Sequence, residues 1–298
     1  MAPIAAHTIT AWNKRISEGR AGKSPKGLIA VAFDQRNHGS RQVDKLANEA
    51  WRQGNERHAI DMYSVYQGTA MDTSLLINHL ESYTFPTHTH RITTHLVLGI
   101  SLGAHAAWHC LLQDPRISAA AIIVGCPDYT ALMSQRAMKS KRKTWTSSKP
   151  AGSHFVGSAD FPPALVEAVK ASDPAGLLMR YNLAAQRAIA GAEGGLDAAE
   201  HVRLRPLFEK HLRGKKILAM SGGADKLVPY ECGQPFYSFL KKAVGPGGWF
   251  TGQGVVFEDL VYEGVGHAVD PRMADRSMAW VGEVLTGELE GGVNEAKI

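Results

Sequence analysis

A serine lies between two glycines at the point where one apolar run ends and another begins, in Gly99-Ile100-Ser101-Leu102-Gly103. Residues 96–100 have the length and composition of a buried strand, and residues 102–112, rich in alanine and leucine, those of a helix. A serine at such a strand-to-helix turn adopts a strained backbone conformation that exposes its hydroxyl at the carboxyl end of a sheet. This context predicts a nucleophile at Ser101, although a glycine-rich turn without chemistry would show the same five residues.

A serine nucleophile needs a base that takes its proton and an acid that orients the base. Asp225 follows the apolar run 216–221 in a glycine-rich turn, and His267 follows the apolar run 255–262. The carboxyl ends of parallel strands meet at one edge of a sheet, so we expect the three residues to lie together. The chain order Ser101, Asp225, His267 therefore predicts a catalytic triad.

Two other aspartates compete for the role of the acid. Asp128 follows the strand predicted after the serine turn and is the main alternative to Asp225. Asp270 precedes Pro271, which is typical of an N-cap followed by a proline in the first helical position. It is therefore expected to cap the last helix.

The chemistry expected at this turn needs no metal ion and no cofactor. We find no histidine or cysteine pattern with metal-ligand spacing, and no Gly-x-Gly-x-x-Gly motif after a strand. The sequence therefore predicts neither a metal nor a cofactor.

These residues require a scaffold in which strands and helices alternate. Helical spacing is found over residues 4–18 and 58–82, the second weakened in its middle by Gly68, and Asp270 opens a final helix that reaches residue 284. The alternation predicts an α/β fold with a mostly parallel sheet flanked by helices, followed by a polar tail from Gly287 that is expected to fray. The predicted strands are residues 28–33, 95–100, 119–125, 216–221 and 255–262.

The alternation breaks between residues 129 and 212. This region holds a basic run at 139–143, a glycine- and serine-rich stretch at 151–158 and short helical pieces, but no predicted strand. We expect a helical insertion that forms a lid over Ser101, within a single domain that spans residues 1–298. Substitutions in the lid should change substrate preference more than the reactivity of Ser101.

Composition excludes several classes of protein. The 298 residues are 44% apolar, enough for one large core, and their net charge of +5 comes from scattered residues and one short cluster typical of a solvated loop. We therefore expect no nucleic-acid partner. Three unevenly spaced cysteines predict no disulfide framework and favour a cytoplasmic protein. No apolar run has membrane-spanning length, and residues 1–20 lack the apolar core of a secretory signal.

Over nearly its whole length the chain resembles the α/β-hydrolase superfamily. Residues 99–103 look like its nucleophile elbow, residues 223–225 like its acid turn and residues 266–267 like its histidine loop. Residues 33–39 are similar to the family's Asp-x-Arg-Gly-His-Gly loop, with Asn37 where glycine is usual. The resemblance implies an α/β-hydrolase fold, and the finer likeness is to prolyl-oligopeptidase-like or dienelactone-hydrolase-like esterases.

The chain departs from this family at its start. Members normally open with about three strands before the first helix, and the loop after the third often donates the second oxyanion N–H. Here the first predicted element is already that helix. The resemblance implies the backbone N–H of Leu102 as one oxyanion donor and leaves the second donor without a visible source. We expect about five strands, with residues 28–33 at or near an unpaired edge that favours self-association, an incomplete oxyanion hole and weak turnover.

The function favoured by these residues is hydrolysis of a carboxylic ester in a small or medium molecule. A peptidase, a thioesterase or a lactone hydrolase would use the same three side chains. A catalytically weak binding protein of the same fold is the alternative outside the enzymes. Reaction with a fluorophosphonate, which requires an activated serine, distinguishes the enzymes from the binding protein.

Overall fold

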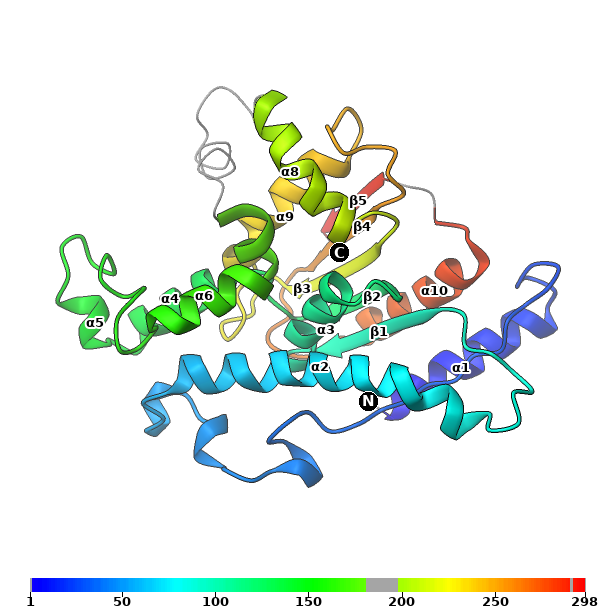
Figure 1. Cartoon of the computed structure of the whole chain (residues 1–298), viewed down its shortest axis with the longest axis horizontal. Helices are drawn as coiled ribbons and strands as arrows, with labels where there is room; N and C mark the ends of the chain where they lie inside the picture. Colours follow the sequence, from blue (N-terminus) through cyan, green and yellow to red (C-terminus); the bar gives the residue numbers. More distant parts are fainter. Residues whose placement is uncertain (1, 181–197, 290–291, 298) are drawn as a thin grey trace.

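The computed structural model describes residues 2–180, 198–289 and 292–297, and it contains a five-stranded sheet between layers of helices (Figure 1). All neighbouring strands are parallel, and their order in the sheet is β1-β2-β3-β4-β5. The chain is thus an α/β protein, as predicted. The strands are β1 (His95–Ile100), β2 (Ile117–Ile123), β3 (Lys216–Gly222), β4 (Val256–Tyr262) and β5 (Gly292–Lys297).

Helices cover both faces of this sheet. One face packs against α3 (Leu102–Gln113), α8 (Ala198–His211) and α9 (Tyr230–Val244), with α2 (His58–Thr84) outside α3. The other face packs against α10 (Pro271–Thr286), which in turn contacts α1 (Ala2–Ser17). Because both faces are covered, β2, β3 and β4 are buried along almost their whole length. Most of their side chains are apolar, and the buried Glu258 and Asp259 of β4 are exceptions.

The strand predicted at residues 28–33 is not formed. The segment is irregular, and the sheet ends at β1, which is only partly buried. The number of strands is nevertheless five, because β5 pairs with β4 in the tail that was expected to fray. The run 28–33 has the composition of a strand, but it has no neighbouring strand to bond.

The helix weakened by Gly68 is one continuous helix, α2. Gly68 is buried against the side chain of Arg36, and a Cβ atom there would lie 2.5 Å from the Arg36 guanidinium. The glycine thus gives space to an arginine that is paired with Asp72 of the same helix.

The predicted insertion, residues 129–212, contains helices joined by turns in its described parts, with residues 147–162 outside any helix, and residues 181–197 lie outside the described residues. It contains α4 (Tyr129–Lys139), α5 (Lys143–Thr146), α6 (Pro163–Ser172), the π-helical turn η4 (Gly176–Arg180) and α8. Its described residues include no strand. The last helix belongs to the main core, where Phe208 is buried among residues of α9, and the earlier ones pack against the start of α2.

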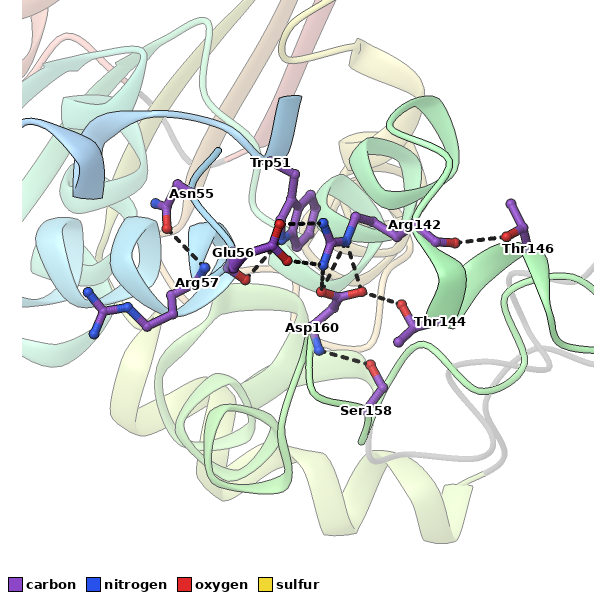
Figure 2. Close-up of polar contacts among 9 residues, drawn as sticks. All are labelled: Trp51, Asn55, Glu56, Arg57, Arg142, Thr144, Thr146, Ser158 and Asp160. Atoms are coloured by element: carbon purple, nitrogen blue, oxygen red, sulfur yellow. Dashed lines mark hydrogen bonds and ion pairs between the residues drawn. The ribbon is translucent and has the colours of Figure 1, made fainter. Parts of the chain in front are cut away.

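Arg142 connects the insertion to the segment before α2 (Figure 2). Its guanidinium lies 2.6 Å from an Asp160 oxygen and 2.5 Å from a Glu56 oxygen, and it lies over the ring of Trp51 at 5.7 Å. Thr144 also donates to Asp160. The basic run was expected to be a solvated loop, but its Arg142 is held in a half-buried network because two carboxylates surround it.

Three buried histidines predict that the fold loses stability in mild acid. Burial lowers the pKa of His58 and of His105 to about 4 and that of His109 to about 3. Each ring therefore stays neutral in the folded protein, while in the unfolded chain it takes up a proton below about pH 6.5. The contribution of the three neutral histidines to the free energy of unfolding is complete above that pH, and it is lost as the pH falls from about 6.5 towards 4.

Below about pH 6.5, the free energy of unfolding should fall by about 1.4 kcal/mol per pH unit for each histidine. Between pH 7.5 and 5.5 the fall for the three should be on the order of 4 kcal/mol, because only the lower unit of this range contributes fully. Urea unfolding at these two pH values measures it. The substitution His109→Gln should reduce the difference by about a third. His88→Asn, at an exposed position, should leave the difference between the two pH values unchanged. Equal effects of the two substitutions would contradict the assignment of the acid sensitivity to the buried histidines.

Candidate functional site

Ser101 occupies the turn between β1 and α3 in a strained backbone conformation, with φ 53° and ψ −116°. Its N–H donates to the carbonyl of Ile123 on β2 at 2.9 Å, and its own carbonyl accepts from Ala104 N at 2.8 Å. The neighbouring strand and the first turn of the helix therefore both fix the position of this residue.

The two glycines of the motif differ in how strictly they are required. A Cβ atom at Gly99 would lie 2.0 Å from the Gly103 carbonyl oxygen, so no side chain fits where the strand and the helix meet. A Cβ atom at Gly103 would meet only the amide nitrogen of Gln35, at 3.4 Å. The close approach that shapes this turn is thus set mainly by Gly99.

His267 approaches Ser101 from the loop after β4. Its Nε2 lies 2.8 Å from Ser101 Oγ. This loop lies against the end of β3, where Ala224 N donates to the carbonyl of Val265 at 2.9 Å. At Gly222 a Cβ atom would lie 2.5 Å from that same carbonyl oxygen. The absence of a side chain at Gly222 allows the histidine loop to lie close to β3.

Asp225 completes a continuous hydrogen-bonded chain. Its Oδ2 lies 2.7 Å from His267 Nδ1, and its Oδ1 accepts from the N–H groups of Leu227 and Val228 at 2.8 and 2.9 Å. Burial raises the pKa of this carboxyl, but the hydrogen bonds from His267, Val228 and Leu227 together lower it further, so the net pKa lies below its usual value. Asp225 is therefore an ionised, fixed acceptor at neutral pH.

The two competing aspartates have other positions. Asp128 is the N-cap of α4 and accepts from Ala131 N at 2.8 Å. Asp270 is the N-cap of α10, as expected, and also pairs with Arg272. The structure brings Asp225 to the imidazole of His267.

The N-terminus of α3 lies directly beside the Ser101 hydroxyl. Leu102 is the first residue of this helix, where a backbone N–H has no acceptor within the helix. Its N–H makes no hydrogen bond to the described residues, and the helix end favours negative charge. The N–H of Leu102 is therefore available to an oxyanion, and we assign no second donor.

Sequence reasoning did not single out Gln35. Its side-chain amide is the group nearest to the Cβ position of Gly103, and its Oε1 is buried without a hydrogen-bond partner among the described residues. The signal that could have found it is the polar loop 34–40, because it directly follows an apolar run predicted as a strand, and polar groups at the carboxyl end of a strand often lie near a site. The other polar side chains of this loop have partners: Asp34 accepts from Ser40, Arg36 pairs with Asp72 of α2, and Asn37 donates to Asn48.

Other kinds of site are not seen in the described ranges. They contain no group of three or more histidine, cysteine or carboxylate side chains that could hold a metal ion. None of their helices is long and apolar enough to cross a membrane. Cys110, Cys126 and Cys232 are buried and free.

No protein-family model and no curated protein matches the chain. Among solved structures, it is similar to two single-substitution variants of SOBER1 from Arabidopsis thaliana, at 14% sequence identity and TM-scores of 0.38 and 0.36. The matches cover 74% of this chain and 65% and 66% of the SOBER1 chains, just under two thirds of their length. By its own geometry, the chain is an α/β protein whose parallel sheet carries a hydrogen-bonded serine, histidine and aspartate beside its carboxyl edge.

Proposed function

We propose that this protein is a serine hydrolase of the α/β-hydrolase type that cleaves a carboxylic ester in a small or medium molecule. The observation that carries the proposal is the chain of hydrogen bonds from Ser101 Oγ to His267 Nε2, at 2.8 Å, and from His267 Nδ1 to Asp225 Oδ2, at 2.7 Å. An intracellular location belongs to the same proposal and is supported by three free, buried thiols.

The geometry supports acyl transfer in two steps. Ser101 Oγ attacks the ester carbonyl while His267 Nε2 takes its proton, and the ionised Asp225 stabilises the imidazolium that forms. The N–H of Leu102 donates to the carbonyl oxygen as it becomes negative. The imidazolium then protonates the departing alcohol, and a water molecule, deprotonated by the same ring, releases the acid from Ser101.

Esters are favoured over amides because only one oxyanion donor is assigned. Loss of one donor typically costs about a hundred- to a thousand-fold in rate. Such a site is best suited to substrates whose leaving group departs easily, which include esters, thioesters and lactones. A catalytically weak binding protein is the second candidate, supported by the same single donor.

Fluorophosphonate labelling followed by peptide mapping tests the proposal. Trypsin releases residues 92–116 as one peptide, and Ser101 is its only serine. We expect one phosphonate adduct per chain, located on this peptide, because the paired imidazole activates the hydroxyl. Heat-unfolded protein is the control and should not be labelled. An adduct elsewhere, or none, would contradict the proposal.

A further inference from the structure

His105 is a buried histidine that contacts the serine turn directly. It lies four residues after Ser101, in the first half of α3, and it is 2% exposed. Its Nδ1 lies 2.9 Å from the carbonyl oxygen of Ser101. The same oxygen accepts from the backbone N–H groups of Ala104 and His105, at 2.8 and 3.2 Å. The carbonyl of the candidate nucleophile therefore has three donors, and one of them is a side chain.

The proton of this imidazole is carried by Nδ1. Burial lowers the pKa of His105 to about 4, so the ring is neutral at pH 7 and has a single N–H. A carbonyl oxygen can only accept a hydrogen bond, so the ring nitrogen beside the Ser101 carbonyl must be the one that donates. Nε2 is consequently unprotonated, and it is buried without a hydrogen-bond partner among the described residues.

Stability alone does not account for a histidine at this position. The ring packs against that of Tyr66, with 5.5 Å between the centroids, and an apolar side chain of similar size would fill the same space without burying an unpaired acceptor. The helix itself already supplies two N–H donors to the Ser101 carbonyl, so α3 can form without a third. What His105 adds is the Nδ1–H group and its hydrogen bond to Ser101.

The carbonyl of Ser101 and the N–H of Leu102 belong to one planar peptide group. A donor that holds the carbonyl oxygen therefore also fixes the direction of the N–H on the opposite side of this group. Hydrogen bonds to a carbonyl polarise the peptide as well, and they strengthen its N–H as a donor by about 10–30% per bond. Ser101 has a strained backbone, with φ 53°, so the orientation of the peptide group that follows it requires such support.

We propose that His105 is a positioning residue for the oxyanion site, because its Nδ1–H fixes and polarises the Ser101–Leu102 peptide group, whose N–H donates to the oxyanion of the substrate. The inference rests on the proposed hydrolase function. His105 acts through the peptide group and takes no part in the transfer of a proton. Since the N–H of Leu102 is the one oxyanion donor that we assign, any weakening of it should lower the rate of acyl transfer directly.

Steady-state hydrolysis of p-nitrophenyl acetate by three variants tests the effect on the reaction. His105→Leu removes the donor but keeps a side chain of similar size, and it should lower kcat roughly tenfold with KM changed by less than about twofold. His105→Asn places an amide N–H near the position of Nδ1, and it should keep kcat within about threefold of the wild type. His109→Leu is the matched control, because it makes the same change one helical turn further along α3, where the ring is bonded to Gln113 instead, and it should leave kcat unchanged.

Nuclear magnetic resonance tests the hydrogen bond itself. With ¹³C at the serine carbonyl carbons and ¹⁵N at the leucines, only the two Ser–Leu peptide groups of the sequence, 74–75 and 101–102, give a coupled signal. In His105→Leu the carbonyl carbon of Ser101 should shift to lower frequency, because it loses a donor, and in His105→Asn it should stay near its wild-type position. The 74–75 signal, from α2, is the internal control and should not move.

A kcat of His105→Leu equal to that of the wild type, or a 101–102 signal that does not move, would overturn the proposal. Equal losses of kcat in His105→Leu and His109→Leu would also overturn it, because they would indicate a general effect of packing. If His105→Leu does not fold, a loss of tenfold or more in the kcat of His105→Asn would overturn it as well. A wild type that hydrolyses no ester contradicts the proposed function instead, and the 101–102 signal then decides whether His105 fixes the peptide group.

Discussion

Replacement of Ser101 by alanine is expected to lower ester hydrolysis by roughly 10⁴- to 10⁶-fold. The substitution removes Ser101 Oγ, the oxygen proposed to form the bond to the acyl group and the atom that is hydrogen-bonded to His267 Nε2. Hydrolysis of p-nitrophenyl acetate and fluorophosphonate labelling of the same samples measure the effect.

The control for this prediction is Ser101→Gly. Both variants lack the hydroxyl, but glycine tolerates the positive φ of this position, so it should be at least as stable to urea as the wild type. Loss of activity without loss of stability would then assign the effect to chemistry. Full labelling or unchanged hydrolysis in either variant would refute the role of Ser101.

Replacement of Asp225 by asparagine is expected to lower the rate by roughly 10⁴-fold. The amide can still accept from the N–H groups of Leu227 and Val228, so the turn should keep its shape. It cannot stabilise the imidazolium of His267, and its NH₂ group favours the wrong tautomer. Steady-state hydrolysis measures kcat, which should fall much more than KM changes.

Asp128→Asn is the matched control, because it makes the same chemical change at the other candidate acid. Asparagine is as good an N-cap as aspartate, so α4 should keep its cap and activity should stay near that of the wild type. If Asp128→Asn proves the more damaging of the two, the acid has been assigned to the wrong residue.

The buried strands could be predicted, because burial in the core requires apolar residues that are visible in the sequence. The runs that form β2, β3 and β4 are mainly apolar because helices cover both faces, and Ser101, Asp225 and His267 could be found because each follows a mainly apolar run. Hydropathy indicates which side chains are buried, but it does not indicate which strands pair through backbone hydrogen bonds. It therefore predicted a strand at residues 28–33, where the partner is absent among the described strands, and missed the polar β5, which pairs through its backbone.

Long-range polar contacts could not be predicted either. The run 139–143 shows no sign that Arg142 meets Glu56 and Asp160, because neither carboxylate lies close to it in sequence. The same holds for Gln35, whose place beside Gly103 depends on how the loop 34–40 returns to the sheet. Spacing along the chain predicts neighbours within an element, but such contacts require the tertiary fold.

The sequential order of the strands has a consequence for how the protein is made. Because β1 to β5 lie in the sheet in the order in which the ribosome synthesises them, each new strand can join an edge that already exists. The serine turn and its two supporting strands emerge first, and Asp225 and His267 follow only after β3 and β4. A nascent chain therefore carries its nucleophile while the next 166 residues, up to and including His267, are added, and until then it lacks the base proposed to activate it.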